Sequence, residues 1–531
     1  MSILGWLVAV QDNFSQTSWE YRVKLFSTLT LVLLTLQWIR IRIRRWRMNL
    51  PFVEGGYPLF GQVFTMVKGS PWDTMAQWVH RYGTMYCFHL FGTDAVAVAD
   101  PDALKVILQT RLKNFRKDVQ GTYKPFMVLL GKGLVTSEGD EWRRQRTLLA
   151  HTLKIDILND VPAMAVDAVA RLCAKLDAAA VSGESLDMAE EFRHLTLQVI
   201  ARAILSVKPD ESDATFAHMY LPIVEEGHKR TWNPVRAFLP GPAMWKFNRD
   251  VHALNTYVTK IIEDRFILRQ KETVVGRSGD ENTGRGMDIL DKTMGAIDPN
   301  TWNEEHVEQI RDEVKTFILA GHETSASMLT WSLFEATQSR DVMTKILEEG
   351  RSVYRASALE ALSRCIDADG DCDAAASREV LKDAPLDNLS YTEACLKESL
   401  RKYSVVPTVV RVATEDIQIK EHFIARGTTL MINIQGVHHN PDFWPKPLEY
   451  IPQRFHKTTP KPYTFLPFVE GARSCLGQFL SLLESKIVLS LLLQRYDFES
   501  VDPKASAAKH PFMVPIIPKT GHFMKVKYRS I

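Results

Sequence analysis

The chain contains 531 residues, of which 45% are hydrophobic and 24% are charged, and its formal net charge at pH 7 is +2. This composition is typical of a globular protein, and the small net charge argues against a general polyanion partner such as nucleic acid. The six cysteines show neither the spacing of a zinc site nor the density of a disulfide scaffold, which favours a reducing compartment.

An apolar stretch lies near the N-terminus, over residues 25–39, and arginines follow it directly at positions 40, 42, 44, 45 and 47. A bilayer span needs about 20 apolar residues, so we expect residues 25–47 to form one membrane anchor with a basic stop, preceded by an N-terminal segment over 1–24. Arginines on the C-terminal side predict that the rest of the chain lies in the cytoplasm. The alternative is a basic amphipathic helix that lies on the membrane surface.

The region after the anchor divides into a short segment over 48–61, which contains Pro51 and Pro58, and one large domain. Residues 83–100 predict a β-hairpin with strands over 85–88 and 95–98. Most of 62–531 is helical in pattern, with a polar flexible loop predicted over 270–286 and a surface insertion over 355–386. The fold class is therefore mainly α with small β-sheets.

Two predicted helices contain residues whose spacing points to a binding or packing role. Trp142 and Arg146 lie at i and i+4, so they share a helix face and both can donate hydrogen bonds to a carboxylate. A long helix is predicted over 304–336 and contains Gly321, although a glycine inside a helix costs about 1 kcal/mol relative to alanine. Close packing at Gly321, with Thr324 bonded back to the Ala320 carbonyl, is the simplest explanation.

Cys475 lies within residues 468–477, FVEGARSCLG, on a turn that leads into a predicted helix. A helix N-terminus lowers a thiol pKa and thereby favours the thiolate, which is the form that binds metals. Gly471 and Gly477 let the backbone pass close to a large flat partner, and Arg473 can pair with an anionic group. A small buried cysteine is the alternative.

This run resembles the haem-ligand loop of the cytochrome P450 superfamily. Further motifs resemble those of its eukaryotic, microsomal members and follow in the same order: WRRQR at 142–146, AGHET at 320–324, ESLR at 398–401 and PQRF at 452–455. The chain departs from the family pattern at Val469, where a small residue is usual, and at 403–407, where an aromatic-Pro-Pro run is usual. The resemblance covers the chain beyond the anchor and implies a proline-rich hinge over 48–61 and a helix-rich domain around a buried haem.

The resemblance also implies roles for individual residues. Cys475 would be the axial iron ligand of a haem b, and because Ala320 replaces the glutamate that some fatty-acid hydroxylases of the family esterify, the haem would be non-covalent. Glu323 and Thr324 would be catalytic and deliver protons. Glu398, Arg401 and Arg454 would be structural. The residues expected to bind the haem are Trp142, Arg146, Ala320, Gly321, Arg411, Phe468, Arg473, Cys475 and Gly477.

The activity implied is that of a haem-thiolate monooxygenase acting on a lipophilic small molecule, namely a sterol, fatty acid, carotenoid or other terpenoid. Its electrons would come from NADPH through a membrane-bound NADPH-cytochrome P450 reductase, with cytochrome b5 as a second candidate donor and Arg143 and Arg144 as candidate docking residues. We expect a single-pass protein of the endoplasmic reticulum, with a plastid membrane as the alternative. A haem-thiolate isomerase or dehydratase acting on lipid hydroperoxides and a non-catalytic haem-binding sensor are the competing functions.

Overall fold

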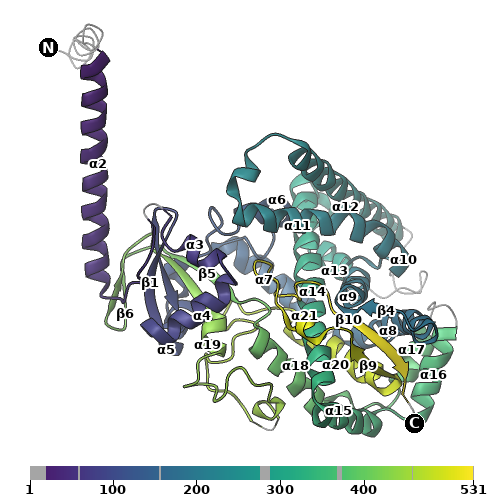
Figure 1. The fold of residues 1–531 in the computed structure, drawn as a ribbon. Coiled ribbons are helices and arrows are strands. Elements are labelled where there is room, and N and C mark those ends of the chain that lie inside the picture. The colour runs from purple at the N-terminus through teal and green to yellow at the C-terminus, as the bar shows by residue number, and fades with distance from the viewer. Residues whose placement is uncertain are drawn as a thin grey trace.

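The structure is a computed structural model that describes residues 19–57, 60–154, 157–274, 288–367, 374–456 and 458–529. Helices form most of it, as the sequence predicts (Figure 1). The longer helices are α2 (Trp19–Met48), α7 (Gly139–Lys154), α8 (Ile157–Ser182), α9 (Met188–Leu205), α11 (His218–Trp232), α12 (Pro242–Val274), α14 (Glu304–Gln338), α15 (Arg340–Val353), α18 (Ser390–Tyr403) and α20 (Gln478–Arg495). The shorter ones are α3 (Val63–Val67), α4 (Pro71–Tyr82), α5 (Pro101–Lys105), α6 (Met127–Leu130), α10 (Pro209–Glu211), α13 (Ile289–Gly295), α16 (Ala356–Asp367), α17 (Ala374–Val380), α19 (Ile434–His438) and α21 (Pro503–Ala507).

The described strands form three small sheets. The largest has the order β1-β2-β8-β5-β3, in which only β2 and β8 run parallel. The predicted hairpin is confirmed as β1 and β2, with Met85 opposite Val98. A second sheet has the order β4-β10-β9, and β6 pairs with β7. The strands are β1 (Met85–Leu90), β2 (Thr93–Val98), β3 (Phe115–Arg116), β4 (Ser185–Asp187), β5 (Thr408–Ala413), β6 (Ile417–Ile419), β7 (His422–Ile424), β8 (Thr429–Asn433), β9 (Tyr496–Ser500) and β10 (Phe523–Tyr528).

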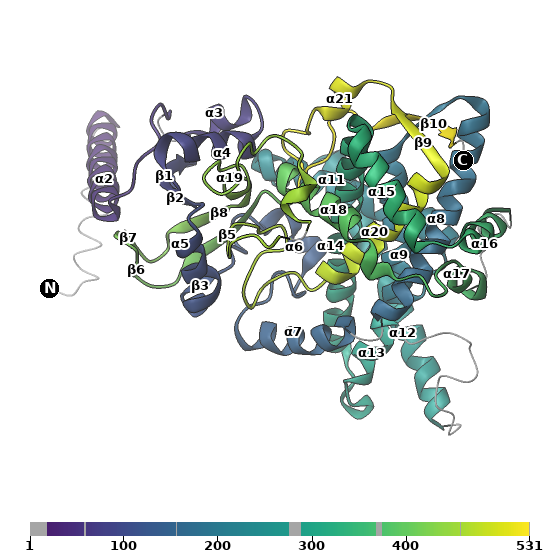
Figure 2. The ribbon, with the colours of Figure 1, turned by 90° about the horizontal axis from the view of Figure 1, so that it is seen from below.

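Helix α14 runs through the middle of the helical part, among α9, α18 and α20 (Figure 2). Its N-terminus is capped by Asn303, whose side chain accepts a hydrogen bond from the His306 N–H. Two glutamates in its first turn interact favourably with the positive end of the helix dipole. The confirmed helix starts at Glu304 as predicted. Close packing explains its mid-helix glycine, because a Cβ at Gly321 would lie 2.6 Å from the Ile200 side chain on α9.

The N-terminal helix differs from the predicted membrane anchor. Helix α2 begins earlier than expected, and it projects from the β-rich part of the domain with its C-terminal end beside the β6–β7 pair (Figure 1). In the part of the chain that the structure describes, no helix is both long enough and apolar enough to cross a bilayer. The expected anchor over 25–47 is therefore not shown.

Arginines of the expected basic stop instead fasten α2 to the β-rich part of the domain. Arg45 makes a bidentate ion pair with the buried Asp94, with N···O distances of 2.8 and 2.7 Å. Arg47 stacks over the Phe423 ring, with its Cζ 4.1 Å from the ring centroid. These contacts fix the helix end, since bidentate pairing and stacking both restrict the orientation of a guanidinium.

The predicted hinge is likewise bound to the domain where it is described. The Cys87 N–H donates to the Pro51 carbonyl at 2.8 Å, and the Val53 N–H donates to the Cys87 carbonyl at 2.9 Å. Residues 51–53 therefore lie alongside β1 as an added short strand segment. Pro58, which the prediction also used, lies outside the described residues.

The two predicted irregular segments contain more helix than expected. Within 355–386, α16 and α17 form and bury Leu362 and Val380 in the core. An amphipathic helix can pack its apolar face against the core even when its other face is polar. Residues 368–373 of that segment lie outside the described part. Helix α12 continues to Val274, so it includes the start of the predicted loop over 270–286, and positions 275–286 are not described.

Candidate active site

The loop before α20 holds Cys475 in a tight turn. The Cys475 N–H donates to the Phe468 carbonyl at 2.8 Å, and α20 begins at Gln478, with Gly477 as its capping residue. Gly471 has a φ of +82°, and a Cβ there would lie 2.2 Å from the Leu108 carbonyl oxygen, so only glycine fits. The prediction that the sulfur lies just before a helix N-terminus is confirmed.

The loop also contains a strained residue. Val469, at the position where the sequence departs from the P450 pattern, has a φ of +57°. A β-branched side chain rarely adopts this left-handed conformation, which costs about 1–3 kcal/mol. The surrounding loop therefore fixes the backbone here against the local preference of valine.

The predicted pKa of the Cys475 thiol is wrong in direction. Desolvation raises the pKa of Cys475, and this outweighs the lowering caused by the Gly477 N–H, by Arg146 and by the Gln478 N–H. The sulfur is nevertheless accessible to solvent. The expected helix effect exists, but desolvation by the surrounding protein outweighs it, and a bound cation would favour the thiolate.

Helix α7 brings its predicted residues to this loop. Arg146 donates to the Ser474 carbonyl at 2.8 Å, and Trp142 is buried under the Arg473 guanidinium, whose Cζ lies 4.1 Å from the ring centroid. Trp142 belongs to a small apolar cluster that also includes Phe317 of α14 and Leu476 of the thiol loop. Three elements distant in sequence therefore meet around the residue pair that the sequence placed on one helix face.

Four cations gather beside the loop: Lys117, Arg146, Arg411 and Arg473. Desolvation, with Arg411 and Arg473 nearby, holds the pKa of Lys117 well below its usual range. Desolvation also lowers the pKa of Arg473 to about 10, although Glu138, paired with it at 2.6 Å, acts to raise it. The cluster carries more positive charge than Glu138 neutralises, so it would stabilise an anion placed among its members. Sequence reasoning missed Lys117 and Glu138, which belong to no recognised motif.

One face of α14 is also open toward solvent. Ala320 is exposed and Thr324 half-buried, although the neighbouring turns of this central helix are buried. Thr324 Oγ1 donates to the Ala320 carbonyl at 2.7 Å, as the simplest prediction stated. Gly321, by contrast, was expected to make room for haem, and its missing Cβ faces Ile200 instead. The structure therefore assigns Gly321 to helix packing.

Glu323 points to the opposite side of α14 and is held by Arg193 of α9. Arg193 Nη2 donates to Glu323 Oε1 at 2.9 Å, and Arg193 also pairs with Glu190 at 2.9 Å. Although desolvation acts to lower it, these two carboxylates raise the pKa of Arg193. The ion pair between Arg193 and Glu323 could not be predicted from motif spacing, because Arg193 lies 130 residues before Glu323 in the chain.

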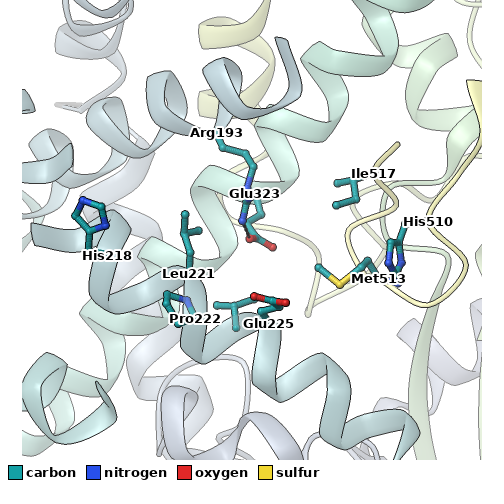
Figure 3. A pocket seen from close by; sticks show the side chains of 10 residues that line it. Arg193, His218, Leu221, Pro222, Glu225, Glu323, His510, Met513 and Ile517 are labelled. Atoms are coloured by element: carbon teal, nitrogen blue, oxygen red, sulfur yellow. Dashed lines mark hydrogen bonds and ion pairs between the residues drawn. The ribbon is translucent and has the colours of Figure 1, made fainter. Parts of the chain in front are cut away.

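A cavity of about 370 Å³ reaches Glu323 from the side of α11 and the C-terminal loop (Figure 3). Arg193 and Glu323 point toward its centre, while Glu225 and His510 enter it from elements on either side. Glu323 is itself only 5% exposed. The Glu323 carboxylate therefore lines a polar cavity on one side of α14, and the next residue, Thr324, lies on the open face of the helix.

The predicted structural residues form a buried network. Glu398 and Arg401, both fully buried, pair at 2.8 Å, and Arg454 reaches the same carboxylate at 3.2 Å. Arg401 further donates to the carbonyls of His438 and Pro447 at 2.9 and 2.7 Å. The network joins α18 to the segment that precedes the thiol loop, which confirms the structural role expected from the sequence.

A scan against protein-family models matches the cytochrome P450 model over residues 51–523. The chain belongs to the cytochrome P450 family. Among curated relatives of this P450, cytochrome P450 4e2 of Drosophila melanogaster is 25% identical over 89% of this chain and 88% of its own. The ultra-long-chain fatty acid omega-hydroxylase of Homo sapiens is 28% identical over 81% and 79%, and the chloroplastic protein LUTEIN DEFICIENT 5 of Arabidopsis thaliana is 26% identical over 81% and 69%.

P450s are monooxygenases that use haem b bound through a cysteine thiolate, and the residues of this P450 fit such a group. Haem carries two carboxylates, which suit the excess of buried cations. Arg411 Nε is buried without a hydrogen-bond partner among the described residues, as expected of a donor that faces a ligand. The accessible thiol of Cys475 supplies the one soft ligand that iron requires.

Proposed function

We propose that this P450 hydroxylates a lipophilic small molecule, with a fatty acid as the first candidate and a sterol, carotenoid or other terpenoid as further ones. The observation that carries the proposal is the exposed residue Cys475, which lies next to the buried Arg411 and the half-buried Arg146 and Arg473 in a chain of the P450 family. The name of the human relative, a fatty acid omega-hydroxylase, supports the choice of fatty acid.

Within this proposal, each predicted site residue except Gly321 has a task. Cys475 would hold the iron, and haem held there would supply the chemistry by which one oxygen atom of dioxygen is inserted into a C–H bond. Arg411 and Arg473 hold the haem carboxylates together with Arg146, which also steadies the thiol loop through Ser474. The remaining haem-facing residues are Trp142, Ala320, Phe468 and Gly477.

Reduction of dioxygen to one inserted oxygen atom and water consumes two protons, so the face of α14 that would meet the haem needs a controlled proton source. Glu323 is suited to this task because it lines the polar cavity that Arg193 and His510 also line. Thr324, the next residue, carries the hydroxyl that passes the proton onward on the open face. The ion pair with Arg193 holds the Glu323 carboxylate in place at the cavity.

The activity is tested by reconstitution of the purified chain with NADPH-cytochrome P450 reductase. We expect a panel of lipids, read by the substrate-induced shift of the haem absorption band, to identify a binder, and NADPH and dioxygen to be required for its hydroxylation. Conversion of a lipid hydroperoxide without NADPH would instead identify an isomerase or dehydratase. Binding without turnover under either condition would identify a sensor.

We also propose that α2 attaches the chain to the endoplasmic reticulum membrane, with the catalytic domain in the cytoplasm near its reductase. The apolar residues 25–39 and the arginines behind them support this. The full chain is expected to stay in the membrane pellet after a high-salt wash, whereas removal of residues 1–39, which spares Arg44 and Arg45, should release it. Release of the full chain by salt alone would contradict membrane attachment through α2.

A further inference from the structure

The loop over 131–138 joins α6 to α7 and lies against α14, next to the site but outside every motif considered above (Figure 2). Two glycines let it approach the helix closely. A Cβ at Gly131, whose φ is +48°, would lie 1.8 Å from Asp312 Oδ2, and a Cβ at Gly133 would lie 2.3 Å from Thr316 Oγ1. The backbone of the loop is therefore in direct contact with side chains of α14.

Two neighbouring acids of α14 bind the backbone of this loop. The Lys132 N–H donates to Asp312 Oδ2 at 3.0 Å, and the Leu134 N–H donates to Glu313 Oε2 at 3.0 Å. Asp312 and Glu313 are 7% and 4% exposed. Burial of carboxyl groups is unfavourable unless they serve as hydrogen-bond acceptors, so these bonds hold the loop strongly.

The opposite side of the same loop serves the cations of the haem site. Ser137 accepts a hydrogen bond at its carbonyl from Arg473 Nη1 at 3.1 Å, and Glu138 pairs with Arg473 Nη2 at 2.6 Å. Glu138 also accepts the Lys117 N–H at 2.8 Å, and the Val135 carbonyl accepts from Lys117 Nζ. The loop thus gives its N–H groups to α14 and its oxygen atoms to Lys117 and Arg473.

Helix α7 fixes the loop a third time. Gln145 donates from Nε2 to the Lys132 carbonyl at 3.1 Å and accepts at Oε1 from Ser137 Oγ at 2.6 Å. One residue further along α7, Arg146 reaches the thiol loop. A displacement of the segment over 132–137 would therefore move both Arg473 and the helix that carries Trp142 and Arg146.

We infer that Asp312 and Glu313 are positioning residues for the haem site, acting through the 131–138 loop on Arg473 and hence on the loop that carries Cys475. The inference rests on the proposed haem roles of Arg473 and Cys475. Neither acid touches the haem in this account. Each sets the place of the loop against which Arg473 is held.

The test measures two quantities in the purified holoenzyme: the half-life of the red-shifted carbon monoxide band and hydrogen exchange of the amides over 132–138. Glu313→Ala is expected to shorten the half-life by about fivefold, the effect of one lost buried hydrogen bond, and to speed exchange in the loop. Asp312→Ala should shorten the half-life more, because it also removes the ion pair that Asp312 makes with the buried Lys315 at 3.0 Å. Desolvation raises the pKa of Glu313 to about 8, so this carboxyl is mostly protonated at neutral pH and Glu313→Gln should match the parent. Glu308→Ala, which removes an exposed ion pair with Arg311 on the same helix, is the matched control.

A double-variant cycle separates positioning from general stability. In an Arg473→Ala background, Glu313→Ala should shorten the half-life by less than about twofold, because the path through Arg473 is already lost. Equal effects in both backgrounds, or fast loop exchange with an unchanged half-life, would overturn the inference. If the alanine variants fail to fold, Glu313→Gln and Gly131→Ala decide: the first must keep the parent's half-life and the second must shorten it. A parent without a red-shifted band would instead overturn the haem assignment, while loop exchange would still test the bond between α14 and the loop.

Discussion

Substitution of Cys475 by serine is expected to abolish the red-shifted absorbance of the reduced, carbon monoxide-bound protein and its NADPH-dependent turnover. Serine keeps the size of the side chain and the backbone bond to Phe468 but replaces the soft sulfur by an oxygen that donates less electron density to iron. Loss of an outer hydrogen-bond partner of a metal ligand costs about 10–100-fold, so loss of the ligand should cost at least about 100-fold. The spectrum and product formation with added reductase measure both effects.

Cys173→Ala is the matched control for Cys475→Ser. Cys173 is a free thiol that is fully buried in the helical core, and loss of its sulfur should cost about 1 kcal/mol of stability without changing the spectrum. A red-shifted band that survives Cys475→Ser but disappears in Cys173→Ala would refute the assignment of the iron ligand.

Local patterns in the sequence predicted the fold well where a repeat or a motif defines an element. The hairpin strands β1 and β2 and the central helix α14 appear where hydrophobic periodicity placed them. Periodicity fails where polar residues outnumber the apolar ones on the face that packs, as in α16 and α17. It also fails where a cluster of charges could interact either with a membrane or with the protein itself. Arg45 could serve a membrane surface or an ion pair, and only the fold reveals Asp94 beside it.

The candidate site shows the same division. Cys475, Trp142 and Arg146 come together as the motif order implied. The sign of the Cys475 pKa shift did not follow from the sequence, because it is the difference between desolvation and helix stabilisation, and only the folded surroundings give the size of each. The acids that hold the 131–138 loop were missed because their partners are backbone N–H groups, which leave no trace in a side-chain pattern.

The proposed proton route makes a second large effect testable. Glu323→Gln removes the acid and its ion pair with Arg193, and Thr324→Ala removes the hydroxyl on the open face. Because general acid catalysis contributes about 10²–10⁴-fold, each variant is expected to lower product formation at least about tenfold. NADPH consumption should fall much less, with the difference recovered as hydrogen peroxide, since dioxygen that takes its two electrons and two protons without protonation by this route is released as peroxide instead of being used for product. The ratio of product to NADPH consumed is the decisive measurement, and Thr324→Ser should restore most of it.

Two residues of the same helix provide controls that isolate the position from the chemistry. Ser332 Oγ donates to the Met328 carbonyl at 2.7 Å, the same local bond that Thr324 makes, and Glu335 is a buried carboxylate paired with Lys402 at 2.6 Å. Ser332→Ala and Glu335→Gln therefore remove a hydroxyl and a carboxylate from α14, away from the polar cavity and the open face, and should keep the parent's ratio of product to NADPH. If all four variants lower that ratio equally, the loss reflects damage to α14 and not the interruption of a proton path through Glu323 and Thr324.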